Sequence, residues 1–166
     1  KRQRFVDLAE IGSYEDGFFN LEVFGKADRV VYLAAYLYHY RRDGSSSVTS
    51  GYNPRLYDQW QTLYDRMEAI IRSNQLGSEY EAALNNRIAL GILGLGLNIT
   101  VSTQPMGKKV KNIRRIIRQE RYRKAYKNLP LNYFPIHWKL FYGCARHGFA
   151  FGVYVLLTVI QRIISR

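Results

Sequence analysis

The chain of 166 residues has a single cysteine, Cys144, so no internal disulfide can form. This excludes the small disulfide-stabilised classes and fits a reducing compartment, from which we expect a cytoplasmic location. The longest apolar run, residues 149–160, is shorter than the roughly 20 residues that a membrane-spanning helix needs, so no spanning segment is predicted. The chain starts at Lys1 without a methionine or a signal-peptide pattern, which suggests a piece of a longer protein.

Acidic residues are almost absent from the last third of the chain. Residues 107–166 contain 14 Lys and Arg but one acid, Glu120, whereas residues 1–106 contain 11 Lys and Arg and 12 Asp and Glu. The formal net charge of +12 therefore belongs to the last third. A block of this kind is typical of a surface that meets phosphates or anionic lipid.

The chain has only four prolines, and apolar residues recur at the helical period over most of its length. A first helix is expected to begin at Ser13, whose hydroxyl would cap the backbone N–H of Asp16, and to end near Gly25. The pattern predicts further helices over residues 54–74, from 78 to beyond 95, and over 108–126, 135–145 and 149–165.

One segment alternates instead. Between Arg29 and Arg42 every second residue is mostly Val, Leu or Ala, which predicts a strand. The expected fold class is therefore α+β and mostly helical, with a helix and short strands before a C-terminal helical region. The expected divisions are residues 1–52, a helical hairpin over 53–106, and a basic amphipathic and aromatic tail over 107–166.

Three motifs follow one another in the first division. They are residues 14–21 (YEDGFFNL), residues 29–33 (RVVYL) and residues 37–47 (LYHYRRDGSSS). This order resembles the end of the catalytic domain in bacterial family 2 glycosyltransferases of the GT-A fold. That family ends its catalytic domain with a Glu-Asp motif that opens a helix, then a strand of the form Leu-Tyr-x-Tyr-Arg and a serine-containing loop. Residues 1–52 are thus interpreted as the C-terminal end of such a domain.

The resemblance implies an inverting transfer of a sugar from a nucleotide-sugar donor to a surface glycan or a lipid-linked acceptor, as in capsule or exopolysaccharide synthesis. Asp16 would be the general base that takes the proton of the acceptor hydroxyl, and Glu15 would orient the acceptor or its neighbours. A divalent metal, Mg²⁺ or Mn²⁺, would help to neutralise the leaving diphosphate. The local pattern alone leaves another explanation, because two acids at a helix start also stabilise the helix dipole.

Three residues of the third motif are candidates for the donor side. His39 corresponds to a metal ligand in some relatives, and a structural, hydrogen-bonded histidine is the alternative. Arg41 suits a diphosphate, because a guanidinium binds phosphate oxygens through two hydrogen bonds, although a salt bridge explains it equally well. Ser46 and its serine neighbours would close over the nucleotide sugar, or would form only a polar loop.

The family holds its metal and nucleotide with an Asp-x-Asp motif and an N-terminal sheet. The chain contains no Asp-x-Asp, so these parts would precede Lys1. The resemblance therefore implies that transfer belongs to a longer protein and that this chain alone is inactive.

The basic tail has a pattern of its own. Over residues 108–127 there are ten Lys and Arg, with several Val and Ile gathered on one side of the predicted helix. Such a helix suits an anionic membrane, nucleic acid or a solvated face, and the aromatic residues that follow favour the membrane. The expected membrane-contacting residues are Lys108, Lys109, Lys111, Arg114, Arg115, Arg118 and Trp138. We therefore expect a peripheral protein at the inner face of the cytoplasmic membrane.

The alternative function, from a different functional class, is that of a non-enzymatic helical binding module. It would bind nucleic acid or a partner protein through the basic tail. The two functions differ in what must precede Lys1, because only the transferase needs a nucleotide-binding domain with an Asp-x-Asp there.

Overall fold

The computed structural model describes residues 4–38 and 51–164. Helices make up 71% of these residues. The elements are α1 (Leu8–Ile11), α2 (Glu15–Phe24), α3 (Leu56–Ser73), α4 (Ser78–Val101), α5 (Met106–Ile117), α6 (Glu120–Asn128), the 3₁₀ helix η1 (Leu131–Tyr133), α7 (Ile136–Arg146) and α8 (Ala150–Ile164).

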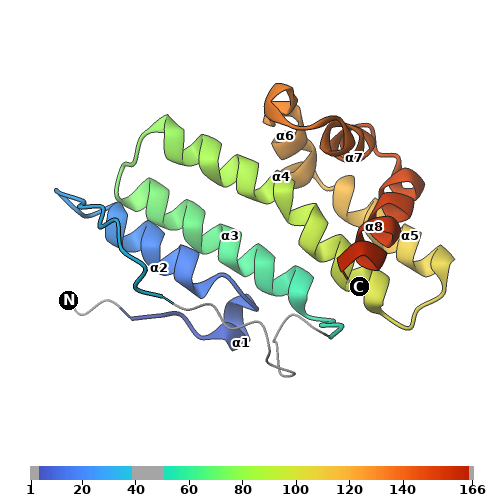
Figure 1. Ribbon diagram of the computed structural model, residues 1–166, viewed down its shortest axis with the longest axis horizontal. Coiled ribbons are helices and arrows are strands. Elements are labelled where there is room, and N and C mark those ends of the chain that lie inside the picture. Colours follow the sequence, from blue (N-terminus) through green and yellow to red (C-terminus); the bar gives the residue numbers. More distant parts are fainter. Residues whose placement is uncertain (1–3, 39–50, 165–166) are drawn as a thin grey trace.

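The helices are arranged around α4 (Figure 1). α3 and α4 run antiparallel as a long hairpin through the middle of the molecule. α1 and α2 contact α3 on one side of this hairpin, whereas α5, α6 and α8 contact α4 on the other. α7 packs against α6 and α8. Helices α1 and α2, which include the Glu-Asp motif, therefore lie on the opposite side of the hairpin from the basic tail.

The expected α+β class is wrong, because the described residues contain no strand and form an all-helical fold. Residues 29–38, the described part of the expected strand, have no regular secondary structure. Alternation predicts an extended backbone, but a strand also needs a neighbouring strand for its N–H and C=O groups, and residues 4–38 and 51–164 supply none. The apolar side chains of this segment are exposed, with Val31 at 76% and Tyr32 at 89%.

Most of the predicted helices are confirmed, since α2, α3, α4, α7 and α8 lie close to the expected ranges. The single helix expected over residues 108–126 is wrong, because α5 and α6 are separated at Arg118 and Gln119. Gln119 has extended backbone angles, and its side-chain carbonyl accepts a hydrogen bond from the Tyr57 hydroxyl of α3. This contact joins residues that are far apart in the sequence. No Gly or Pro stands at the interruption, so the local sequence does not indicate it.

One hydrophobic core runs from α1 to α8. Its largest fully buried side chains are Ile11, Leu63, Tyr64, Ile92, Leu95, Ile113, Ile117, Tyr122, Tyr126, Phe141, Val153 and Leu157. The apolar side expected for the basic helix is confirmed, because Ile113, Ile116 and Ile117 of α5 are buried.

Glycines let α3 and α8 approach α4 closely. A Cβ added at Gly91 would lie 2.3 Å from the Tyr64 hydroxyl oxygen, and a Cβ at Gly94 would lie 2.6 Å from the Trp60 ring. A Cβ at Gly96 would lie 2.4 Å from Leu157 of α8. The absence of a side chain at these three glycines therefore permits the close packing of the helices.

By length and composition, the 24 residues of α4 are enough to cross a membrane. The buried helices of soluble proteins meet the same criterion, and α4 packs against α3, α5, α6 and α8. Residues 150–160 of the apolar run lie in α8, which has 15 residues.

Replacing Gly91 with alanine is expected to destabilise the protein by about 1 to 3 kcal/mol, because the added methyl group meets the buried Tyr64 side chain. The Tyr64 hydroxyl has no hydrogen-bond partner among the described residues. Tyr64→Phe should therefore be nearly neutral alone and should restore most of the stability that Gly91→Ala loses. Urea denaturation of the single and double variants measures this coupling.

Gly143 is the matched control. It lies inside α7, and no atom of another part of the described chain is within 4 Å of the position of an added Cβ. Gly143→Ala should therefore stabilise the protein by up to about 1 kcal/mol, through helix propensity alone. If Gly91→Ala behaved like Gly143→Ala, the close approach of α3 to α4 would be wrong.

Candidate functional site

Glu15 and Asp16 are the first two residues of α2, at the helix start that the sequence predicts. Asp16 is exposed and Glu15 is half-buried. One carboxylate oxygen of Asp16 accepts a hydrogen bond from the backbone N–H of Gly17 at 2.6 Å. The positive end of the helix dipole favours negative charge at both positions. The Asp16 carboxylate is thus held close to the helix start and remains open to a ligand.

The expected cap by Ser13 is wrong. Tyr14 occupies the N-cap position and makes no side-chain cap bond. The Ser13 hydroxyl instead accepts a hydrogen bond from the indole N–H of Trp60 at 3.1 Å. This bond ties the turn before α2 to α3, so the start of α2 is positioned by a tertiary contact and not by a local cap.

Tyr14 holds a strained backbone directly before the two acids. Its φ of 76° and ψ of 25° lie in the left-handed region that residues other than glycine rarely adopt. Its ring lies against Gly17, where an added Cβ would be 2.3 Å from the ring, and the Arg87 guanidinium lies 4.0 Å from the ring centroid. Strain of this kind occurs often at functional sites, so the packing around Tyr14 is consistent with a built site at Glu15 and Asp16.

Sequence reasoning missed Arg87, whose guanidinium lies over the ring of Tyr14, the residue directly before these acids. Arg87 is the only Lys or Arg in α4, and a single cation in the middle of such an apolar helix is a signal that something must accommodate it. In the described part of the chain its partners are aromatic rings, since the guanidinium also lies 5.0 Å from the Trp60 ring centroid. Burial raises the pKa of the adjacent Tyr64 hydroxyl to about 12, so Tyr64 stays neutral and does not act as a base here.

The donor-side candidates His39, Arg41 and Ser46 lie outside the described residues, so their roles stay predictions. Within residues 4–38 and 51–164, no three His, Cys, Asp or Glu side chains gather as a metal site. The expected Mg²⁺ or Mn²⁺ therefore finds no such ligand set in the part of the chain that the structure describes.

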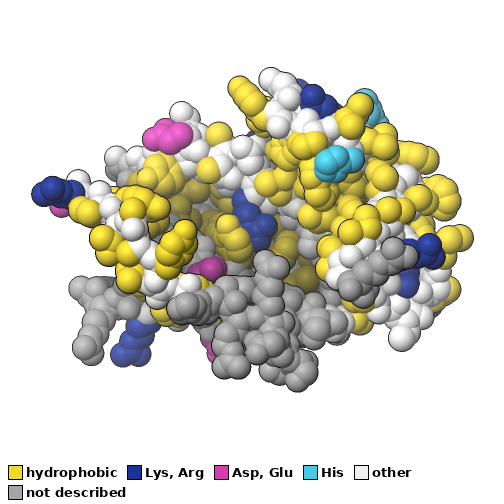
Figure 2. Space-filling view, in the orientation of Figure 1, with side chains coloured by type: hydrophobic (Ala, Val, Ile, Leu, Met, Phe, Trp, Pro, Cys, Tyr) yellow, Lys and Arg dark blue, Asp and Glu magenta, His cyan; other side chains and the backbone are white. Residues whose placement is uncertain are grey.

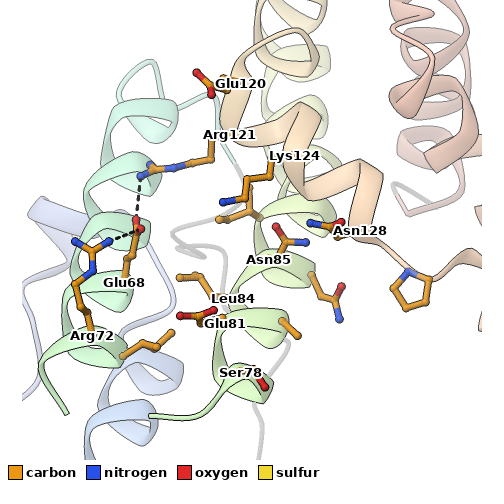
Figure 3. A pocket seen from close by; sticks show the side chains of 15 residues that line it. Glu68, Arg72, Ser78, Glu81, Leu84, Asn85, Glu120, Arg121, Lys124 and Asn128 are labelled. Atoms are coloured by element: carbon orange, nitrogen blue, oxygen red, sulfur yellow. Dashed lines mark hydrogen bonds and ion pairs between the residues drawn. The ribbon is translucent and has the colours of Figure 1, made fainter. Parts of the chain in front are cut away.

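A groove of about 860 Å³ lies between α3, α4 and α6 (Figure 3). On one wall Glu68 pairs with Arg72 at 3.0 Å and with Arg121 at 3.7 Å. The other polar side chains that line it are Ser78, Glu81, Asn85, Asn86, Glu120, Lys124 and Asn128. Amides and charges of both signs make this groove suited to a polar ligand rather than an apolar one.

The residues expected at a membrane surface have different environments. Lys108, Lys111, Arg114, Arg115 and Arg118 are exposed. Lys109 is half-buried, and its ammonium group donates a hydrogen bond to the Thr100 carbonyl at 2.8 Å. Trp138 is half-buried in an aromatic cluster, with its ring 5.9 Å from that of Phe141 and 6.0 Å from that of Tyr142.

No protein-family model matches the chain, and no curated protein or solved structure is significantly similar to it. The functional assignment therefore depends on the residues of the chain and on the resemblance of its motifs.

Proposed function

We propose that this chain is the C-terminal part of a bacterial inverting glycosyltransferase of family 2, which transfers a sugar from a nucleotide-sugar donor to a surface glycan or a lipid-linked acceptor. The observation that supports the proposal most is the position of Glu15 and Asp16. They open α2 in the order that the family motif requires, and Asp16 presents its carboxylate to solvent. Tyr14, with its strained backbone, directly precedes this helix start, and the Arg87 guanidinium packs on the Tyr14 ring.

Asp16 is the general base of the proposed reaction. The acceptor hydroxyl oxygen forms a bond to the anomeric carbon of the donor sugar, from the face opposite the diphosphate, and the bond between that carbon and the diphosphate oxygen breaks. The proton of the hydroxyl moves to the free oxygen of Asp16 as the new bond forms. Glu15, which is half-buried beside it, orients the acceptor. A divalent metal supplies positive charge to the departing diphosphate when it is bound.

The segment 29–38 also supports the proposal. Its Val, Tyr and Leu side chains are largely exposed in the described part of the chain, with Tyr36 fully exposed and Leu37 at 77%. An apolar surface of this kind marks a place where another protein surface packs. In the proposed enzyme, the nucleotide-binding domain supplies that surface.

The coding sequence before Lys1 is a direct test. The proposal requires an upstream region of alternating strands and helices that contains an Asp-x-Asp motif, because this chain has none. An unrelated or very short upstream region would contradict the proposal. It would favour the alternative, a basic helical module that binds nucleic acid or a partner protein through residues 107–166.

A further inference from the structure

Helix α8 exposes an apolar stripe. Four exposed residues recur at every fourth position and are 43% to 69% exposed: Phe151, Val155, Val159 and Ile163. Because residues four apart are neighbours on a helix surface, these side chains form one row along α8. The opposite side of α8 is buried and carries Ala150, Val153 and Leu157. Packing of α8 in the core therefore does not account for the exposed row.

Helix α7 extends this surface. Ile136 and Leu140 are also four residues apart, and they are 84% and 58% exposed. Phe149, in the turn between α7 and α8, is 57% exposed. Figure 2 shows hydrophobic side chains over α7 and α8, with Lys and Arg side chains at the edge of this area. We call the seven residues the α7–α8 face: Ile136, Leu140, Phe149, Phe151, Val155, Val159 and Ile163.

The charge around the α7–α8 face has one sign. Glu120 is the only acid among residues 107–166, against 14 Lys and Arg. Helix α5 packs against α8, and its side chains Lys108, Lys111, Arg114 and Arg118 are exposed. Single exposed apolar residues are ordinary on soluble proteins, but a contiguous row bordered by cations marks an interaction surface.

We propose that the α7–α8 face docks in plane on an anionic lipid bilayer, with the α8 stripe at the boundary between head groups and acyl chains and the α5 cations against lipid phosphates. The sequence indicated a membrane surface through α5 and Trp138. The structure changes the apolar part of that contact, because Trp138 packs in the aromatic cluster and the apolar stripe of α8 is more exposed. This docking goes beyond the transferase proposal and does not depend on it.

Charge favours a bilayer over a second copy of the chain. A symmetric dimer through this face would bring two strongly positive tails together, which repel each other. Nucleic acid would satisfy the cations but would leave Val155, Val159 and Ile163 without a role, since phosphate contacts dominate such interfaces. An anionic bilayer is the partner that matches both the apolar row and the positive border.

Co-sedimentation of the 166-residue chain with vesicles tests the docking. We expect binding to vesicles of phosphatidylcholine and phosphatidylglycerol, weakened by salt, and little binding to phosphatidylcholine alone. Val155→Ser combined with Val159→Ser should lower the partition coefficient about tenfold. Charge reversal at Lys108, Arg114 and Arg118 together should lower it roughly a hundredfold or more.

Matched variants on the other side of the hairpin distinguish docking through the α7–α8 face from non-specific adsorption to the vesicles. Val30→Ser combined with Val31→Ser removes two valines that are 64% and 76% exposed, and it should leave the partition coefficient unchanged. Charge reversal at Lys26 and Arg29 should have a much smaller effect than reversal on α5. Circular dichroism before each assay confirms that the helix content is intact.

Two results would overturn the docking proposal. One is an equal loss of vesicle binding for the Val30 and Val31 pair and for the Val155 and Val159 pair. The other is the absence of binding to anionic vesicles together with tight, salt-sensitive binding to duplex DNA or RNA. Neither result depends on whether the protein transfers sugars, so the transferase proposal would be tested separately.

Discussion

Replacing Asp16 with asparagine in the proposed full-length transferase is expected to lower turnover about a hundredfold or more, while binding of the nucleotide sugar stays largely intact. Asparagine keeps the shape of the side chain and its hydrogen bond from the Gly17 backbone N–H, but its amide does not take up the proton of the acceptor hydroxyl. Steady-state kinetics with separate determination of donor binding measures the effect. The loss should therefore appear in kcat.

Asp58 provides the matched control for Asp16. It is an exposed aspartate in the first turn of α3, as Asp16 is in the first turn of α2. Asp58→Asn should remove a comparable helix-dipole interaction and leave kcat unchanged. Equal kcat for the wild type and Asp16→Asn, or equal losses for Asp16→Asn and Asp58→Asn, would remove the role of general base from Asp16.

Replacing Leu157 with alanine is expected to cost about 2 to 5 kcal/mol of unfolding free energy, because the side chain is fully buried against Gly96 of α4 and its removal leaves a cavity. Val155→Ala, on the exposed side of the same helix, should change stability by less than about 0.5 kcal/mol. Chemical denaturation of both variants measures the difference. Similar effects at the two positions would show that α8 does not pack as described.

Much of the helical architecture could be predicted from the sequence, because apolar residues at the helical period identify the buried sides of α3, α5 and α8. The alternation in residues 29–38 misled the prediction, since period-two alternation indicates an extended backbone but carries no information about a pairing partner. The interruption between α5 and α6 could not be predicted from the sequence either. It coincides with the hydrogen bond between Tyr57 and Gln119, which are 62 residues apart, and neither Gly nor Pro stands there.

The candidate site was predictable only in part. The position of Glu15 and Asp16 at the start of α2 could be predicted, because the local pattern and the family motif both indicate a helix start there. The contacts that hold the helix start were not predictable, because Trp60 and Arg87 come from α3 and α4 and reach Ser13 and Tyr14 through the tertiary fold. The sequence also favoured Trp138 as a membrane residue by composition, whereas its partial burial in the aromatic cluster depends on how α7 packs.

Release of nucleoside diphosphate from nucleotide sugars is the measurement that tests the central claim most directly. The assay compares the full-length protein with the 166-residue chain, in the presence of Mg²⁺ or Mn²⁺ and of glycan or lipid-linked acceptors. We expect acceptor-dependent release by the full-length protein, none by the 166-residue chain, and strongly reduced release by full-length Asp16→Asn. A folded full-length protein that binds no nucleotide sugar and releases no nucleoside diphosphate with any donor would contradict the assignment.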